Sequence, residues 1–172
     1  SYPGQNRSVQ NARKAQDPPS ESIIIHENQV QDHYVETYEI EMLKGRSFRE
    51  DLPTDSNHFV INQTAARKLG LANPIGQQIY IFQQKGEIIG VMNDFHFRSL
   101  HHELEPLVLT HESEYFGQIS IRLNRSNLSS TIDYIRNTVH QFDEDYYFRY
   151  NFVEDVFADL YQQERQTNRM IR

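Results

Sequence analysis

The chain has 172 residues, with 17 Lys and Arg against 24 Asp and Glu, and its formal net charge of −7 disfavours nucleic acid and other phosphate-rich partners. It contains no cysteine, which excludes a thiol nucleophile, a Cys-ligated zinc site and a disulfide. Hydrophobic residues make up 37% of the chain and include ten Phe and ten Tyr, enough to predict one folded domain or two small subdomains with a real core.

The first predicted element is a loop or loose arm over residues 1–20. This segment is rich in Gln, Asn, Ser, Arg and Pro, a composition that buries too little apolar surface to order itself. The β-branched run Ser22-Ile23-Ile24-Ile25-His26 predicts a strand. Residues 34–43 carry apolar residues at mixed spacing, so helix and strand both stay open there.

A strand followed by a capped helix is predicted over residues 59–70. Phe59-Val60-Ile61 is the strand, Asn62 can accept hydrogen bonds from the first helical turn, and Gly70 ends the helix. Paired strands are predicted next over residues 79–82 and 87–92, with the turn near Lys85-Gly86.

Two more strands are predicted over residues 107–109 and 119–123. The second alternates with a period of two, which predicts one buried face. Apolar residues at helical spacing then predict a helix over residues 132–142, and alternating aromatic and polar residues predict a strand over residues 146–152. The strand-dense middle could be a subdomain inserted within an α/β domain.

A C-terminal helix is predicted over residues 153–172. Acidic residues at its beginning and Arg165, Arg169 and Arg172 at its end match the helix dipole. Because its apolar stripe is confined to its first half, the second half is predicted to project from the core.

One neighbourhood is rich in histidine and comprises Asp94, His96, His101, His102 and His111. Imidazole and carboxylate groups could bind zinc or nickel. The spacing matches no template such as HExxH, so histidines that are solvated or hydrogen-bonded for structural reasons are the simpler interpretation.

Other signatures of catalysis do not appear in the sequence. The glycines form neither GxGxxG nor a P-loop, and no GxSxG frames a serine. Carboxylates that could pair for acid–base catalysis or bind calcium are also explained by solvated loops; they are Glu103, Glu105, Asp143, Glu144 and Asp145. We therefore predict no enzyme, no cofactor, and no catalytic, cofactor-binding or metal-binding residue, and we assign no ligand or partner contact.

Several stretches together resemble the extracytoplasmic (periplasmic) core domain of MacB/FtsX-like ABC-transporter permeases, particularly the Bacteroidetes type. In chain order they are YVETYEI (34–40), LKGRSF (43–48), VINQTAARKLG (60–70), NPIGQQI (73–79), GEIIGVMNDFHFRSLH (86–101), EPL (105–107) and YQQE (161–164). Their order and spacing cover about Asp32 to Arg172, and residues 86–101 are the most specific. Residues 1–31 match poorly beyond Tyr2-Pro3-Gly4.

The resemblance implies an α+β fold in which an α/β, porter-like subdomain carries an inserted β-rich subdomain and a C-terminal stalk helix. On this basis residues 1–31 are expected to belong to the porter-like subdomain, with a loose first part, and residues 32–104 to form the insert. Residues 105–152 would be the second half of the porter-like subdomain, and residues 153–172 a stalk leading to a membrane span. The resemblance also implies that Asp94 to His101 is a structural turn.

For function, the resemblance implies a segment on the periplasmic side of the inner membrane that couples cytoplasmic ATP hydrolysis to export or mechanotransmission. The expected partners are its own transmembrane helices, a separate ATPase subunit or domain, a periplasmic adaptor and a second copy of the permease, but no nucleic acid. Since the chain starts without Met, we expect a segment of a longer protein. Two alternatives stay open: a sensor for a peptide, lipid or antibiotic, and a metal-dependent hydrolase using His96, His101 and His102.

Overall fold

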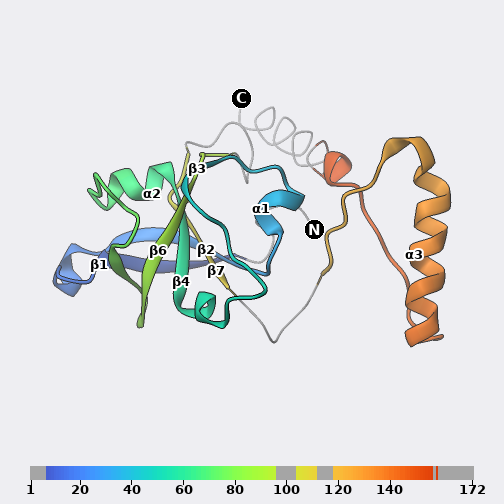
Figure 1. Ribbon diagram of the computed structural model, residues 1–172, viewed down its shortest axis with the longest axis horizontal. Helices are drawn as coiled ribbons and strands as arrows, with labels where there is room; N and C mark the ends of the chain where they lie inside the picture. Colours follow the sequence, from blue (N-terminus) through green and yellow to red (C-terminus); the bar gives the residue numbers. More distant parts are fainter. Residues whose placement is uncertain (1–6, 96–103, 112–117, 157, 159–172) are drawn as a thin grey trace, which may run out of the picture. The chain divides into compact units, whose positions relative to one another are not determined.

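The computed structural model describes residues 7–95, 104–111, 118–156 and 158, and its fold is α+β (Figure 1). The chain divides into two compact units, Tyr2–Gly117 and Gln118–Arg172, the latter grouped with Ser1.

The first unit is built mainly from strands. Its strands are β1 (Arg7–Lys14), β2 (Ile23–Val30), β3 (Met42–Gly45), β4 (His58–Asn62), β5 (Gln78–Ile81), β6 (Gln84–Met92) and β7 (Leu107–His111). Its helices are α1 (Tyr34–Thr37), α2 (Gln63–Lys68) and the 3-10 turns Pro19–Glu21 and Pro53–Asn57.

Six of these strands close into a barrel. The order β6-β4-β7-β2-β1-β5 returns to β6, because β5 and β6 also pair, and β3 joins β6 as an additional strand. The pairs β2–β7 and β4–β6 are parallel, whereas the others are antiparallel. In the ring β7 lies between β2 and β4, and it does not pair with β6, the strand that precedes it in the sequence.

Two apolar clusters line the two faces of this sheet. The cluster of alternate strand residues that also packs on α2 includes Ala12, Ile25, Phe59, Ile61, Ile79, Ile88 and Val108. The cluster on the opposite face packs on α1 and the following loop and includes Val30, Val35, Phe48, Val60, Met92, Leu107 and Leu109. The period-two alternation of strands explains why neighbouring residues such as Val60 and Ile61 fall in different clusters.

The predicted loop over residues 1–20 is wrong for residues 7–14, which form β1. This strand lies between β2 and β5, and Ala12 is fully buried. The segment lacks apolar alternation because Ser8 and Gln10 instead donate hydrogen bonds to the buried carboxylate of Glu27, at 2.8 and 3.1 Å. Hydrogen bonds to Glu27 therefore occupy inward positions of β1 at which apolar side chains usually pack.

The strand and capped helix predicted for residues 59–70 are confirmed as β4 and α2, and Gly70 follows the helix with φ of 66°. The predicted pair over residues 79–92 is also confirmed, as β5 and β6. Its turn lies at Phe82-Gln83, not at Lys85-Gly86, because Ile81 pairs directly with Gln84.

The predicted subdomain boundaries stay a prediction. In the structure, β1 and β2 from the first 31 residues and β7 from beyond residue 104 share the barrel with β4, β5 and β6. The division by contacts falls between residues 117 and 118.

The second unit contains a 3-10 turn (Arg125–Asn127) and α3 (Leu128–Phe142), which confirms the helix predicted over residues 132–142. The segments that flank α3 run alongside it (Figure 1). The strands predicted over residues 119–123 and 146–152 are wrong, since neither segment is a strand in the structure. The predicted buried face is also absent, because Ile119 and Ile121 are 83% and 54% exposed.

The predicted C-terminal helix begins as expected, with residues 153–156 helical and the N–H of Val156 donating to the carbonyl of Phe152. Its remaining part, apart from residue 158, lies outside the described residues. Within the part of the chain that the structure describes, no helix has both the length and the apolar character needed to cross a bilayer.

Candidate functional site

The structure separates the members of the His-rich neighbourhood that it describes. Asp94 accepts hydrogen bonds from the backbone N–H and the hydroxyl of Thr64, at 2.9 and 2.8 Å. Thr64 lies in the first turn of α2, where the helix dipole favours a negative charge. Asp94 is therefore a helix-capping residue. The structural turn that the resemblance implies over Asp94 to His101 stays a prediction, because residues 96–101 lie outside the described residues.

His111 lies elsewhere, at the end of β7. Its Nε2 is 3.3 Å from Oδ1 of Asp32, and its ring centroid is 5.4 Å from that of Phe48. Within residues 7–95, 104–111 and 118–156, no three metal-ligating side chains gather in one place. His96, His101, His102 and Glu103 lie outside the described residues.

The other candidate carboxylates have separate surroundings. Glu105 pairs with His26 at 3.1 Å. Asp143, Glu144 and Asp145 are exposed after α3, where Asp143 accepts a hydrogen bond from the N–H of Asp145 at 3.1 Å. This is the geometry of an Asx turn, so the solvated-loop interpretation accounts for these three residues.

Asn62 connects three elements of the barrel. Its Oδ1 accepts hydrogen bonds from the N–H groups of Ala65 and Leu107, both at 2.9 Å, and its Nδ2 donates to the carbonyl of Glu105 at 2.9 Å. The side chain is 1% exposed. The predicted capping role is thus confirmed, and the same side chain also fixes the beginning of β7.

Replacing Asn62 with alanine should lower the free energy of unfolding by about 3 kcal/mol, because it removes a helix cap and leaves three buried backbone groups without partners. Asn62→Asp should cost a similar amount, since a carboxylate oxygen would then face the carbonyl of Glu105. Urea unfolding followed by circular dichroism measures both effects. Asn127→Ala is the matched control, because Asn127 precedes α3 without a side-chain cap and should change the stability by less than about 0.5 kcal/mol. Equal effects at the two asparagines would contradict the assigned role.

A second polar cluster centres on Asp55, whose side chain is fully buried. Arg46 donates two hydrogen bonds to its carboxylate at 2.7 and 2.8 Å, the N–H of Arg49 donates a third at 2.9 Å, and Nδ1 of His58 lies 2.7 Å away. Burial raises the pKa of Asp55, but the bonds from Arg46, His58 and Arg49 lower it by more, so the pKa lies well below its ordinary value.

The glycines of the LKGRSF and GEIIGVM stretches allow β3 and β6 to approach closely. A Cβ atom on Gly45 would lie 2.1 Å from the carbonyl oxygen of Ile89, and one on Gly90 would lie 2.2 Å from that of Arg46. Gly45 also has φ of 70°, which disfavours other residues. The motifs that carry the resemblance therefore supply caps, an ion pair and close contacts.

Sequence reasoning missed the role of Asp55 and of Glu27. Glu27 is 8% exposed and, besides Ser8 and Gln10, accepts a hydrogen bond from the hydroxyl of Thr110 at 3.0 Å. Neither residue belongs to a motif or a periodic pattern, so no local signal identifies it. Both clusters satisfy buried charges and hold elements of the barrel together.

Comparison with known proteins gives a family and a fold. The family profile described as "MacB-like periplasmic core domain" matches residues 4–139. No curated protein sequence matches the chain.

Three solved structures are similar. The periplasmic region of MacB from Actinobacillus actinomycetemcomitans is 14% identical with a TM-score of 0.52, over 78% of this chain and 64% of that one. A domain described as part of a permease from Porphyromonas gingivalis is 14% identical with a TM-score of 0.56, over 84% and 73%. The extracellular domain of the ABC-type transporter YknZ from Gram-positive bacteria is 21% identical with a TM-score of 0.47, over 60% and 49%. The chain thus spans about half of the YknZ chain and just under two thirds of the MacB chain.

Proposed function

This chain belongs to the MacB-like periplasmic core domain family, and on that premise we propose that it is the extracytoplasmic domain of an ABC-transporter permease. In this role it couples ATP hydrolysis in a cytoplasmic subunit or domain to export or mechanotransmission across the inner membrane. The observation that carries the proposal is the family match over residues 4–139. The coupling role itself rests on the resemblance.

The surroundings of the motif residues suit a structural role. Asn62, Asp94, Arg46 and Gly90 hold strands and helices together. A domain that transmits motion needs rigid elements that move as units. The closed barrel and its internal polar bonds satisfy this requirement.

We also propose that α3 and the segments that flank it belong to the second half of a porter-like subdomain, which the resemblance places over residues 105–152. The apolar residues of α3 recur at helical spacing, as expected of a helix that packs on another element. The rings of Phe148, Tyr150 and Phe152 follow one another at 5.9 and 5.6 Å, as alternate residues of an extended segment do.

The proposed role of the C-terminal helix as a stalk that transmits movement can be tested by interrupting the helix with a flexible insertion. Inserting Gly-Gly after Gln162 within the predicted C-terminal helix should reduce ATP-dependent export by the parent permease about tenfold, because a flexible joint no longer transmits displacement. The readout is transport by the permease together with its ATPase in membrane vesicles. The melting temperature of the 172-residue chain should be unchanged.

The control is the same insertion after Asp17, in the turn between β1 and β2, where a short insertion lengthens a surface loop. Transport should be retained there. Full transport by the Gln162 insertion, or equal losses at both positions, would contradict the coupling role.

A further inference from the structure

The turn between β5 and β6 holds an aromatic residue in a strained conformation. Because Ile81 pairs with Gln84, Phe82 and Gln83 form a two-residue hairpin loop, and Phe82 has φ of 52°. Such loops favour glycine at positions with positive φ, and a bulky side chain is strained there. Phe82 is nevertheless 63% exposed, so its burial does not compensate for the strain. Backbone strain of this kind is found preferentially at functional positions.

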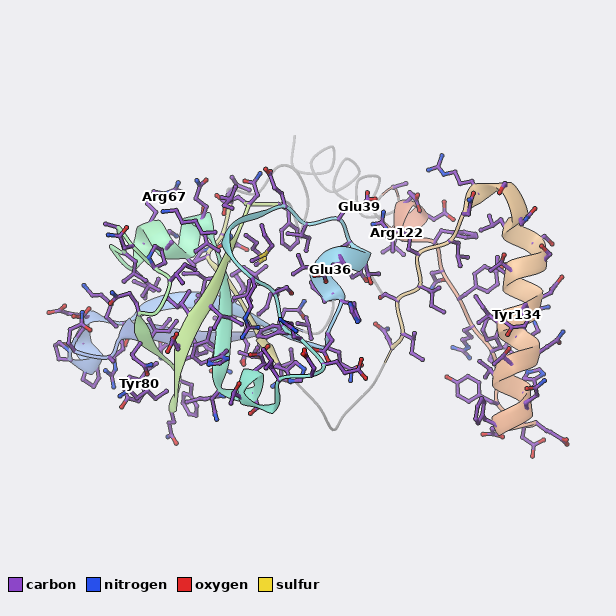
Figure 2. All side chains as sticks on the ribbon, viewed as in Figure 1. Glu36, Glu39, Arg67, Tyr80, Arg122 and Tyr134 are labelled. Carbon is purple, nitrogen blue, oxygen red and sulfur yellow. The ribbon has the colours of Figure 1, made fainter. Side chains whose placement is uncertain are left out.

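Phe82 borders an apolar face on the outside of the barrel. Its N–H donates to the carbonyl of Asn11 at 2.7 Å, which places the turn beside β1. Val9 on β1 and Ile24 on β2 point outward and are 59% and 66% exposed. Tyr80 points away from the barrel (Figure 2). We call the side chains of Val9, Arg13, Ile24, Tyr80 and Phe82 the Phe82 face.

The Phe82 face is cationic in an acidic protein. Glu27 is the one acidic residue of β1, β2 and β5, and it lies inside, bonded to Ser8. Arg13 stacks on Tyr80 with its guanidinium carbon 4.1 Å from the ring centroid. Lys85 pairs with Tyr80 in register and extends the face onto β6, where Glu87 follows two residues later. Within the described residues, neither Arg13 nor Lys85 forms an ion pair, although the whole chain has a net charge of −7.

We propose that the Phe82 face docks on a membrane surface that contains anionic phospholipids. Phe and Tyr rings prefer the boundary between headgroups and acyl chains, and the stems of Arg and Lys lie along apolar surface while their charges reach phosphates. Charge complementarity favours such a surface, because Arg13 and Lys85 outnumber Glu87, the carboxylate on the same side of β6, and Glu27 lies inside the barrel. The inference does not depend on the coupling role.

The test is sedimentation of the 172-residue chain with vesicles of phosphatidylcholine alone or with about 40 mol% phosphatidylglycerol. We expect binding to the anionic vesicles that weakens when salt is raised from about 50 to about 300 mM. Phe82→Gly should lower the partition coefficient about tenfold and Lys85→Gln about fivefold. Because glycine adopts a positive φ without strain, the melting temperature of Phe82→Gly should be no lower than that of the parent chain. A loss of vesicle binding by this variant would then not be caused by unfolding.

Phe142→Gly is the matched control, because Phe142 at the end of α3 is 89% exposed but belongs to the other unit. It should bind like the parent chain. Equal binding to neutral and anionic vesicles, no binding to either, or unchanged binding by Phe82→Gly would overturn the proposal. If the chain ignores vesicles but self-associates in analytical ultracentrifugation, and Phe82→Gly abolishes this, the face serves a protein partner instead and the lipid assignment is wrong.

Discussion

Replacing Asp55 with alanine is expected to lower the free energy of unfolding by about 3 kcal/mol. The substitution removes two charge-assisted hydrogen bonds from Arg46 and the acceptor of the Arg49 N–H. Arg46 is 35% exposed and can regain water, which keeps the loss at the lower end of the range for buried ion pairs. Urea unfolding at pH 7 measures the effect, with Asp51→Ala as the control, since Asp51 pairs with Arg49 while 63% exposed.

The contribution of Asp55 should also depend on pH. Its pKa is lowered in the folded state, so the unfolded state binds a proton more readily, and the stabilisation is present above the ordinary aspartate pKa of about 3.9. It is lost as the pH falls below about 4. The difference in unfolding free energy between the parent chain and Asp55→Ala should therefore shrink as the pH falls from 5 to 2. A constant difference over that interval would show that the ionised carboxylate of Asp55 is not the source of the stabilisation.

Gly90→Ala should be at least as damaging, at about 3 kcal/mol or more. The added methyl group would lie 2.2 Å from the carbonyl oxygen of Arg46 and 2.6 Å from Cε of Met42. The side chain of Met42 can move, but the Arg46 carbonyl is backbone, so relief requires separating β3 from β6. The expected result is a lower melting temperature together with faster hydrogen exchange of the backbone N–H groups in β3.

Gly70→Ala separates this steric cost from the conformational cost of losing glycine. Gly70 has φ of 66°, and a Cβ atom there would meet nothing within 4 Å. Its substitution should therefore cost only about 1 kcal/mol, through the left-handed backbone alone. If Gly90→Ala cost no more than Gly70→Ala, the close approach of β3 and β6 would not be the reason for glycine at position 90.

Local signals predicted the elements whose order depends on nearby residues. The β4–α2 connection carries its cap, Asn62, and its terminator, Gly70, within a few residues, and α3 carries an apolar stripe of its own. β1 could not be recognised because two of its inward side chains, Ser8 and Gln10, are polar and their partner Glu27 lies on another strand. Residues 119–123 show the opposite case, in which alternation is present but a strand also requires a neighbouring strand.

The functional interpretation depended on different information. Residue types alone suggested a metal site that includes Asp94, whereas the order of the motifs implied a structural role for it. In the structure Asp94 accepts hydrogen bonds from Thr64 at the start of α2. The cluster around Asp55 could not be predicted from the sequence, because Arg46 and Asp55 lie nine positions apart in polar loop sequence without a recognisable pattern. The Phe82 face was equally hidden, since a positive φ cannot be read from side-chain pattern.

The position of β7 in the ring has a consequence for the synthesis of the protein. β2 and β4 both pair with β7, and residues 107–111 leave the ribosome long after their partners. Until then the nascent chain has two unpaired strand edges, and closure must await contacts of high sequence separation, which form slowly. Unpaired edges invite association between chains. The edges of β2 and β4 are therefore covered only when β7, the last strand of the barrel, has been synthesised and has paired with both.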